Sequence, residues 1–210
     1  MTRLCKFILI FCSVAFCSCE QKNGYSKVDA DVARLSNKII PLVNFLDNPD
    51  SCKKALQFLD SATTIDKGCF LCYYNKLMFL YSLKEYGKAV ETVNECIRLN
   101  PSGHDLYLTG GILYERVGDT VSAKKYFQKS LTICNSILDT MSKKNSDFDM
   151  LAGNKAIDLI MLGDKIEADK ILKTLYDSQK DVKMKNMTLS LMNKTKKELI
   201  EQLTGNRFSH

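Results

Sequence analysis

Three alanines recur at the same interval along this chain of 210 residues. Ala55, Ala89 and Ala123 lie 34 residues apart, and Tyr73 and Tyr107 share that spacing. A period of this length is typical of proteins built from repeated helix-turn-helix units. Two antiparallel helices approach closely only where a side chain is small, so alanine marks the point of packing. The period therefore predicts an all-α fold in which helix pairs stack as an α-solenoid.

Two segments carry the pattern most clearly, Phe70 to Gly103 and His104 to about Ile137. In the later segment the recurring positions hold small and aromatic residues: Tyr107, Gly110, Gly111, Tyr114, Gly118, Asp119, Ala123 and Phe127. Both segments resemble the tetratricopeptide repeat, in which an aromatic residue opens the first helix and an alanine begins the second. This resemblance implies a right-handed superhelix of antiparallel helix pairs.

The earlier segment departs from the pattern of that family at three positions. Lys76, Leu77 and Leu80 stand where the family favours leucine, glycine and tyrosine. We expect Gly87 and Gly118 to lie in the short connections between paired helices, where a positive φ is often needed.

Weaker copies flank the two clear ones. The segment from Ser36 to Cys69 has one apolar face, and Pro41 is expected to kink or restart its first helix. A fourth copy, from about Asp149 to Val182, begins its second helix 45 residues after the third copy instead of 34. Because the excess of 11 residues equals about three helical turns, we predict a long helix from about Thr120 to Lys143.

The chain is expected to end in a helix rich in Lys and Met. This helix, roughly Lys183 to Leu203, would cover the last apolar face of the solenoid. Three of its lysines, Lys194, Lys196 and Lys197, are interpreted as a solvated helix face and not as a nucleic-acid site. The predicted organisation is a signal peptide, a tether, about four repeats, and a capping helix with its tail: 1–18, 19–28, 29–182 and 183–210.

The N-terminus has the features of an export signal. Arg3 and Lys6 precede a short apolar stretch, which is too short to span a membrane. The stretch ends in Phe16-Cys17-Ser18-Cys19, which resembles a bacterial lipobox and implies lipidation of Cys19. The alternative is ordinary cleavage without lipid. We expect a lipoprotein anchored in the bacterial cell envelope, on its periplasmic face or at the cell surface.

Cysteine usage leaves two alternatives open. After loss of the signal and lipidation, five of the nine cysteines remain: Cys52, Cys69, Cys72, Cys96 and Cys134. Because Cys72 and Cys96 fall at neighbouring ends of one hairpin, a disulfide between them is one possibility. The other is that the thiols are small buried side chains. The Cys69-x-x-Cys72 spacing suggests neither redox catalysis nor metal binding, because no βαβ pattern and no second ligand motif accompany it.

The sequence contains no motif that indicates an enzyme or a cofactor. It lacks the GxSxG elbow, a phosphate loop and HExxH. Gly110 and Gly111 are interpreted as helix-packing positions. We therefore predict a non-enzymatic protein without cofactor or metal.

The first helix of each repeat is expected to line an apolar concave groove. The predicted groove residues are Leu71, Tyr74, Met78, Tyr81, Leu108, Ile112, Glu115, Ile157, Ile160 and Met161. Exposed apolar surface of this kind marks a partner site, for a helix or an extended peptide. The alternative is that the C-terminal helix, or the kinked helix before Asp47, folds back and fills the groove.

The sequence thus predicts an exported, lipid-anchored scaffold that binds an unidentified protein or peptide and no nucleic acid. The runner-up is a glycan-binding or glycan-uptake lipoprotein. Glycan-capturing lipoproteins of gut bacteria resemble this chain in their helical repeats but are far longer and carry binding loops rich in Trp. This chain has no Trp.

Overall fold

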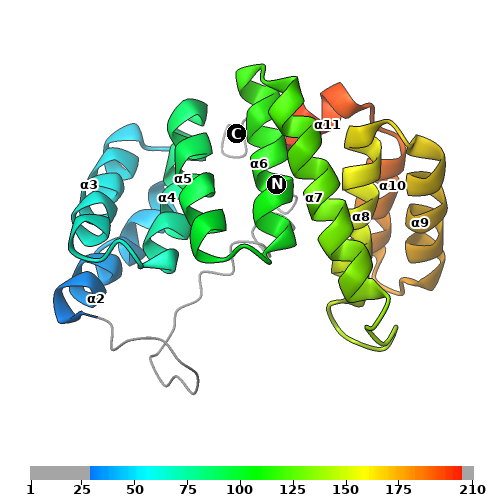
Figure 1. The fold of residues 1–210 in the computed structure, drawn as a ribbon, viewed down its shortest axis with the longest axis horizontal. Coiled ribbons are helices and arrows are strands. Elements are labelled where there is room, and N and C mark those ends of the chain that lie inside the picture. Colours follow the sequence, from blue (N-terminus) through cyan, green and yellow to red (C-terminus); the bar gives the residue numbers. More distant parts are fainter. Residues whose placement is uncertain (1–28, 205–210) are drawn as a thin grey trace. The chain divides into compact units, whose positions relative to one another are not determined.

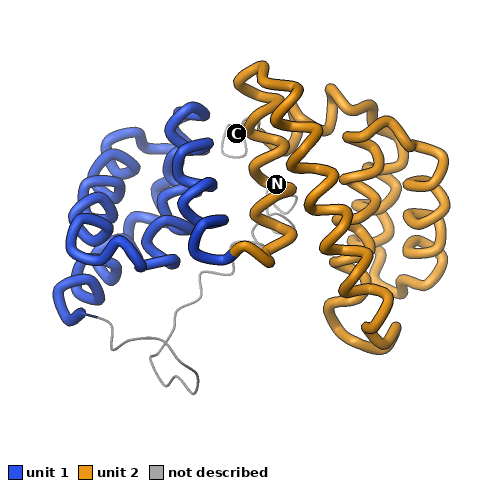
Figure 2. Tube along the Cα trace, in the orientation of Figure 1, with its two compact units in different colours: residues 1–100, 206–210 blue, residues 101–205 orange. Residues whose placement is uncertain are grey.

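The computed structural model describes residues 29–204. They form ten α-helices and one short 3-10 helix, and this part of the chain contains no strand. The predicted all-α class, an α-solenoid of helix pairs, is confirmed. The chain divides into two compact units, and the division falls between Asn100 and Pro101 (Figure 2). The predicted signal peptide, the tether and Cys19 lie outside the described residues.

Unit 1 is a run of helices that pack consecutively against one another (Figure 1). Its elements are α2 (Ala30–Asn37), η1 (Ile40–Phe45), α3 (Pro49–Ile65), α4 (Phe70–Ser82) and α5 (Tyr86–Leu99). Pro41 lies in the first turn of the short 3-10 helix η1, after α2 has ended. The expected interruption at Pro41 is confirmed, since proline has no N–H for an α-helical bond.

The core of unit 1 is apolar and centres on α3. Ala55, Leu59 and Ala62 are completely buried, as their predicted shared face requires. They belong to one cluster with Cys72 and Phe79 of α4. The first repeat therefore packs through the small and apolar residues that the 34-residue period indicated.

Unit 2 contains six helices. They are α6 (His104–Val117), α7 (Thr120–Leu138), α8 (Phe148–Leu162), α9 (Lys165–Ser178), α10 (Val182–Met192) and α11 (Lys196–Thr204). The helices α6 to α10 pack each on the next, and α11 returns to pack against α6 (Figure 1). None of the helices between residues 29 and 204 combines the length and the apolar character that a membrane span requires.

At the crossing of α6 and α7 only a glycine fits at position 111. A Cβ atom at Gly111 would lie 2.5 Å from Cε1 of the Phe127 ring. Both residues are buried, and Ala123 of α7 is completely buried as well. The structure thus confirms that Gly111 is a packing position and not part of a phosphate loop.

The prediction of a helix from Thr120 to Lys143 is wrong at its C-terminal end. α7 stops at Leu138, and residues 139–147 form turns before α8 begins. The helix is five residues longer than α5, with 19 residues against 14. The following connection is also five residues longer than residues 100–103, and α8 is one longer than α6. The excess of 11 is therefore shared between helix and loop.

The single C-terminal helix that we expected is divided into α10 and α11. Thr195 and Glu198 form a reciprocal capping box, in which the Thr195 N–H donates to Glu198 Oε2 at 2.8 Å. The Glu198 N–H donates back to Thr195 Oγ1 at 3.3 Å. Such a box starts a new helix, so the chain turns at residues 193–195 and α11 can leave α10. The N–H of Thr195 also lowers the pKa of Glu198.

The tight turns inside the helix pairs use a left-handed residue, but not always a glycine. Gly118 and Gly163 have φ angles of 87° and 92°. The expectation for Gly118 is confirmed, whereas that for Gly87 is wrong, because Gly87 lies inside α5. Lys84 takes the left-handed conformation there, with φ 58°. It lies 34 residues before Gly118 and thus at the same repeat position.

Candidate interaction surface

In unit 1 the predicted groove residues lie on α4 and differ in exposure. Leu71 is 40% exposed, and Tyr74 and Tyr81 are partly buried. Tyr74 stacks on Phe70 with ring centroids 5.7 Å apart. Met78 is buried in the core of the unit and is therefore not part of an open surface. An accessible apolar strip remains on α4, formed by the other three residues.

In unit 2 the predicted groove residues are largely covered. On α6, Leu108 and Ile112 are 6% and 7% exposed. On α8, Ile160 and Met161 are each 4% exposed, and Ile157 is partly buried. The expectation of an open apolar groove is therefore wrong for these residues, Ile157 excepted. Of the two alternatives that the sequence left open, the structure has the C-terminal helix in contact with α6.

The contact between α11 and α6 combines apolar burial with one ion pair. Leu199 and Leu203 of α11 are 0% and 7% exposed. Lys196 Nζ donates to Glu115 Oε1 at 2.5 Å, and the Glu115 side chain is only 9% exposed. A charge-assisted bond to a shielded carboxylate fixes orientation more firmly than a surface pair does. The sequence placed Glu115 in the groove but did not pair it with Lys196.

Lys76 shows why one departure from the repeat pattern is tolerated. Its Nζ lies 2.6 Å from Asp60 Oδ1, so the lysine joins α4 to α3. The Lys76 side chain is 17% exposed. An ion pair to the preceding helix thus replaces the apolar contact that leucine would make.

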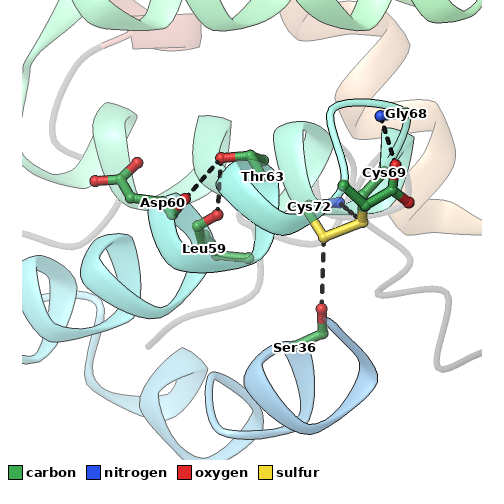
Figure 3. Close-up of a disulfide and its surroundings, with 8 residues drawn as sticks. Ser36, Leu59, Asp60, Thr63, Gly68, Cys69 and Cys72 are labelled. Atoms are coloured by element: carbon green, nitrogen blue, oxygen red, sulfur yellow. Dashed lines mark hydrogen bonds between the residues drawn. A yellow bond between two sulfur atoms is a disulfide. The ribbon is translucent and has the colours of Figure 1, made fainter. Parts of the chain in front are cut away.

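The predicted disulfide between Cys72 and Cys96 is wrong. Cys69 and Cys72 form a disulfide across the first turn of α4, with their Cα atoms 5.3 Å apart (Figure 3). Residues three apart at a helix start are neighbours, so Cys69 reaches Cys72 before any residue of α5 can. Cys52, Cys96 and Cys134 are buried and take no part in a disulfide.

A buried polar cluster between α7 and α8 was missed in the sequence. Asp158 is completely buried, and Ser130 Oγ donates to its Oδ2 at 2.6 Å. Asp158 Oδ1 and Asn154 Nδ2 have no hydrogen-bond partner. Burial raises the pKa of Asp158 to about 8, although the Ser130 bond opposes that rise. The spacing of Asn154 and Asp158, four residues apart in an otherwise apolar segment, was the available signal.

The cluster of Ser130, Asn154 and Asp158 lies close to the buried thiol of Cys134 but does not form a metal site. Desolvation, followed by the charge of Asp158, raises the pKa of the Cys134 thiol to about 12. Between residues 29 and 204 no three His, Cys, Asp or Glu side chains gather so that they could hold a metal ion.

Comparison with known proteins relates the helix pair α4–α5 to a family. Residues 71–102 match the model of the tetratricopeptide repeat (TPR). The chain is thus similar to TPR proteins, as its sequence predicted. The match supports a role in protein–protein interaction.

One curated relative and two solved structures share the similarity. A TPR repeat-containing protein of Methanocaldococcus jannaschii is 30% identical over 130 residues, which are 62% of this chain and 21% of the relative. This chain therefore spans about a fifth of that relative's length. YrrB, described as a TPR protein with an unusual peptide-binding site, aligns over 87% of both chains with 17% identity and a TM-score of 0.48. MamA aligns over 85% of this chain and 98% of its own, with 7% identity and a TM-score of 0.48.

Proposed function

We propose that this chain is an exported, lipid-anchored scaffold that binds a helical segment of another protein. The observation that carries the proposal is the position of α11 on α6. There unit 2 already accepts a short amphipathic helix through Leu199, Leu203 and the pair of Lys196 with Glu115. A helix laid on an apolar face is a recurring mode of peptide recognition.

The structure of α11 suggests which chemistry a partner helix needs. Lysine and the two leucines occupy positions i, i+3 and i+7, which lie on one face of a helix. A partner that displaces α11 would present a basic residue to Glu115 and apolar residues at the same spacing. In the resting chain α11 occupies this face, so a partner must outcompete a segment held at high effective concentration.

The accessible strip on α4 is the second surface that supports the proposal. Leu71, Tyr74 and Tyr81 present apolar and aromatic area there, and such residues are enriched where proteins bind one another. We expect Tyr74→Asp to weaken partner binding in a crosslinked pull-down from membranes. A charge at Ile112 would instead unfold unit 2, because that side chain is buried.

A peptide-binding experiment tests the role of the α6 face directly. The probe is a fluorescent peptide with the sequence of residues 194–204. We expect the full chain carrying Leu199→Asp to release α11 and bind this peptide, and the unaltered chain to bind it far more weakly. Lys197→Glu is the matched control, because Lys197 is exposed and makes no contact that fixes α11.

The ion pair between Lys196 and Glu115 supplies a second test, which changes no buried apolar residue. The variant Glu115→Lys should bind a peptide carrying Lys196→Glu in preference to the natural peptide. If neither variant binds its peptide while circular dichroism shows intact helices, the α6 face does not accept a helix in trans. Retention of the purified chain on a glycan array, with no peptide binding, would favour glycan capture instead.

The lipid anchor is tested separately. Metabolic labelling with a palmitate analogue should label the unaltered chain and not the Cys19→Ser variant. Cys17→Ser is the matched control and should keep the label, because Cys17 follows Phe16 and is a poor cleavage site. If the Cys19→Ser variant were labelled as strongly as the unaltered chain, Cys19 would not be the lipidated residue. The proposal that the chain binds a helix would not be affected.

A further inference from the structure

The cysteine pair at the start of α4 has features that a purely structural cross-link does not need. We propose that Cys69 and Cys72 form a thiol–disulfide exchange site whose substrate is a dithiol, on a protein or a small molecule. In this assignment an external thiolate attacks Cys69, and Cys72 is the leaving group. The proposal does not depend on the binding of a helix by unit 2.

The two sulfur atoms differ in access. Cys72 is completely buried in the core of unit 1, whereas Cys69 is partly exposed in the turn before α4. Attack on a disulfide requires the nucleophile to reach one of its sulfur atoms. Solvent can therefore deliver a thiolate to Cys69 but not to Cys72.

The start of α4 stabilises negative charge on Cys69. Cys69 is the N-cap residue, and its Sγ accepts the backbone N–H of Cys72 at 3.3 Å. The free N–H groups of a first helical turn and the helix dipole favour an anion at this position. The same arrangement lowers thiol pKa values at helix N-termini. When the pair is reduced, Cys69 is thus the sulfur placed to attack in the reverse direction.

A hydroxyl group lies beside the leaving sulfur. Ser36 Oγ of α2 is 3.6 Å from Cys72 Sγ (Figure 3). Since a bridged sulfur carries no proton, the serine hydroxyl is the donor in this contact. It is positioned to stabilise the charge that develops on Cys72 as the disulfide opens. Without that contact a thiolate would form in an apolar core, where burial opposes it.

The turn before the pair is held in place by side chains. The Gly68 N–H donates to Asp66 Oδ1 at 2.7 Å. Arg98 of α5 donates to the Lys67 carbonyl at 3.1 Å. These bonds fix the chain on the exposed side of Cys69, so the sulfur is presented in one orientation.

The exchange balances without any further reagent. The thiolate of the dithiol bonds to Cys69 Sγ, the bond between Cys69 and Cys72 breaks, and its electron pair goes to Cys72 Sγ. Cys72 then takes the proton of the neighbouring Ser36 hydroxyl, which is partly exposed and regains a proton from solvent. The second thiol of the substrate, as a thiolate, attacks its own sulfur in the mixed disulfide and releases Cys69. The protein pair gains two electrons, and the dithiol becomes a disulfide.

The remaining described cysteines serve as internal controls. Cys52, Cys96 and Cys134 are buried and are not disulfide-bonded. Burial raises the pKa of the Cys52 thiol and, with a contribution from Asp158, raises that of Cys134 to about 12. They should stay unmodified in the folded chain, so reaction at Cys69 is not a general property of its cysteines.

The test follows the redox state of the full chain by peptide mass mapping. The folded chain is equilibrated in mixtures of reduced and oxidised dithiothreitol, trapped with iodoacetamide and digested. We expect the pair to be reduced and reoxidised reversibly while circular dichroism stays constant. In the reduced chain, Cys69 should be alkylated at least about tenfold faster than Cys72.

Single variants separate exchange from a structural role. Cys72→Ser should form a stable mixed disulfide with glutathione at Cys69, whereas Cys69→Ser should leave Cys72 unmodified over the same time. Ser36→Ala should slow reduction of the pair by dithiothreitol by a few-fold without changing the helical signal. If the Cys72→Ser variant fails to fold, the alkylation rates of the unaltered chain decide the question. A pair that opens only in denaturant, or equal alkylation of Cys69 and Cys72, would overturn the proposal.

Discussion

The helix pair α4–α5 of unit 1 and the pair α6–α7 of unit 2 share one register but fill their crossings in opposite ways. Leu77 of α4 corresponds to Gly111 of α6, and Val93 of α5 corresponds to Phe127 of α7, each 34 residues on. All four residues are buried. In unit 1 the larger residue is therefore on the first helix and the smaller one on the second. In unit 2 the glycine is on the first helix and the large phenylalanine on the second. The repeat constrains the combined volume at the crossing and not each residue separately.

The two units also differ in the polar groups that they bury. In the described part of unit 1, the buried polar side chains are Thr63 and Thr92, and each donates to a carbonyl of its own helix. Unit 2 buries Asp158, with one oxygen bonded to Ser130 and the other without a partner. Burying a hydroxyl that is hydrogen-bonded within its own helix costs the fold little free energy. A buried carboxyl must stay protonated, because burying its ionised form destabilises the fold.

The largest effect that sharpens this difference is expected from Asp158→Asn. Burial raises the pKa of Asp158 to about 8, above its unfolded value. The folded chain therefore binds the proton more strongly, and stability falls as pH rises through this interval. The variant has no proton to lose and keeps an oxygen for Ser130. At pH 7 we expect it to raise the free energy of unfolding by roughly 3 to 4 kcal/mol.

The pH dependence gives the decisive measurement. Relative to the variant, the unaltered chain should lose roughly 2 to 3 kcal/mol between pH 5 and pH 7, and the difference should level off above about pH 8. Denaturant titrations at several pH values measure it. Asp177→Asn on the exposed side of α9 is the matched control and should leave the pH profile unchanged. A parallel profile for the Asp158→Asn variant would show that Asp158 is not the group that titrates.

A smaller effect is expected at the crossing of α6 and α7. Gly111→Ala places a methyl group 2.5 Å from the Phe127 ring, and an aromatic ring in a packed core cannot move aside freely. We expect the substitution to lower the free energy of unfolding by about 2 kcal/mol. Thermal and denaturant unfolding of the folded variant measure this loss.

The double variant Gly111→Ala with Phe127→Val tests the idea of shared volume. It gives unit 2 the smaller second-helix side chain that unit 1 has in Val93. Its destabilisation should be less than the sum of the two single effects by about 1 kcal/mol or more. Additive effects would mean that the two positions do not share one space, and the comparison of the crossings would fail.

Much of the fold could be predicted because the repeat positions report local packing. Ala55, Ala89 and Ala123 are all completely buried, as the period required. Helix ends were less predictable, because the apolar stripe of α7 continues past Leu138 although the helix does not. The capping box of Thr195 and Glu198 was present in the sequence but lies inside a segment that otherwise favours helix.

The candidate surface was less predictable, since its exposure depends on what packs upon it. The spacing placed Leu108 and Ile112 correctly on one helix face, but it did not indicate that α11 would lie against α6. The disulfide was predicted wrongly for a different, local reason. The pairing depends on where α4 begins: with Cys69 as its N-cap residue, Cys69 and Cys72 are neighbours in the first turn. Contacts between distant segments arise from tertiary packing, which a local pattern does not contain.

The turns within the helix pairs extend the comparison. In unit 2, Gly118 and Gly163 adopt positive φ, and the residues that follow them, Asp119 and Asp164, cap the next helix through backbone N–H groups. In unit 1, Lys84 adopts positive φ and is followed by Glu85, whose side chain makes no cap bond. The turn between α4 and α5 therefore carries a backbone penalty that the turns of unit 2 avoid.

The smallest predicted effect comes from exchanging the residues at these turns. A left-handed conformation costs an L-residue about 1 to 2 kcal/mol, so Gly118→Ala should lower the free energy of unfolding by about 1 kcal/mol. Lys84→Gly should raise the free energy of unfolding by about 0.5 kcal/mol. Glycine removes the cost of the left-handed conformation, but its flexibility in the unfolded chain offsets part of that gain.

Gly87→Ala is the matched control within α5, where a Cβ meets nothing within 4 Å, and it should not destabilise the chain. Denaturant titrations of the three variants under one condition measure the order. Destabilisation by Lys84→Gly would mean that the lysine side chain stabilises the turn between α4 and α5. The turn of unit 1 would then depend on a side chain, whereas the turns of unit 2 depend on glycine.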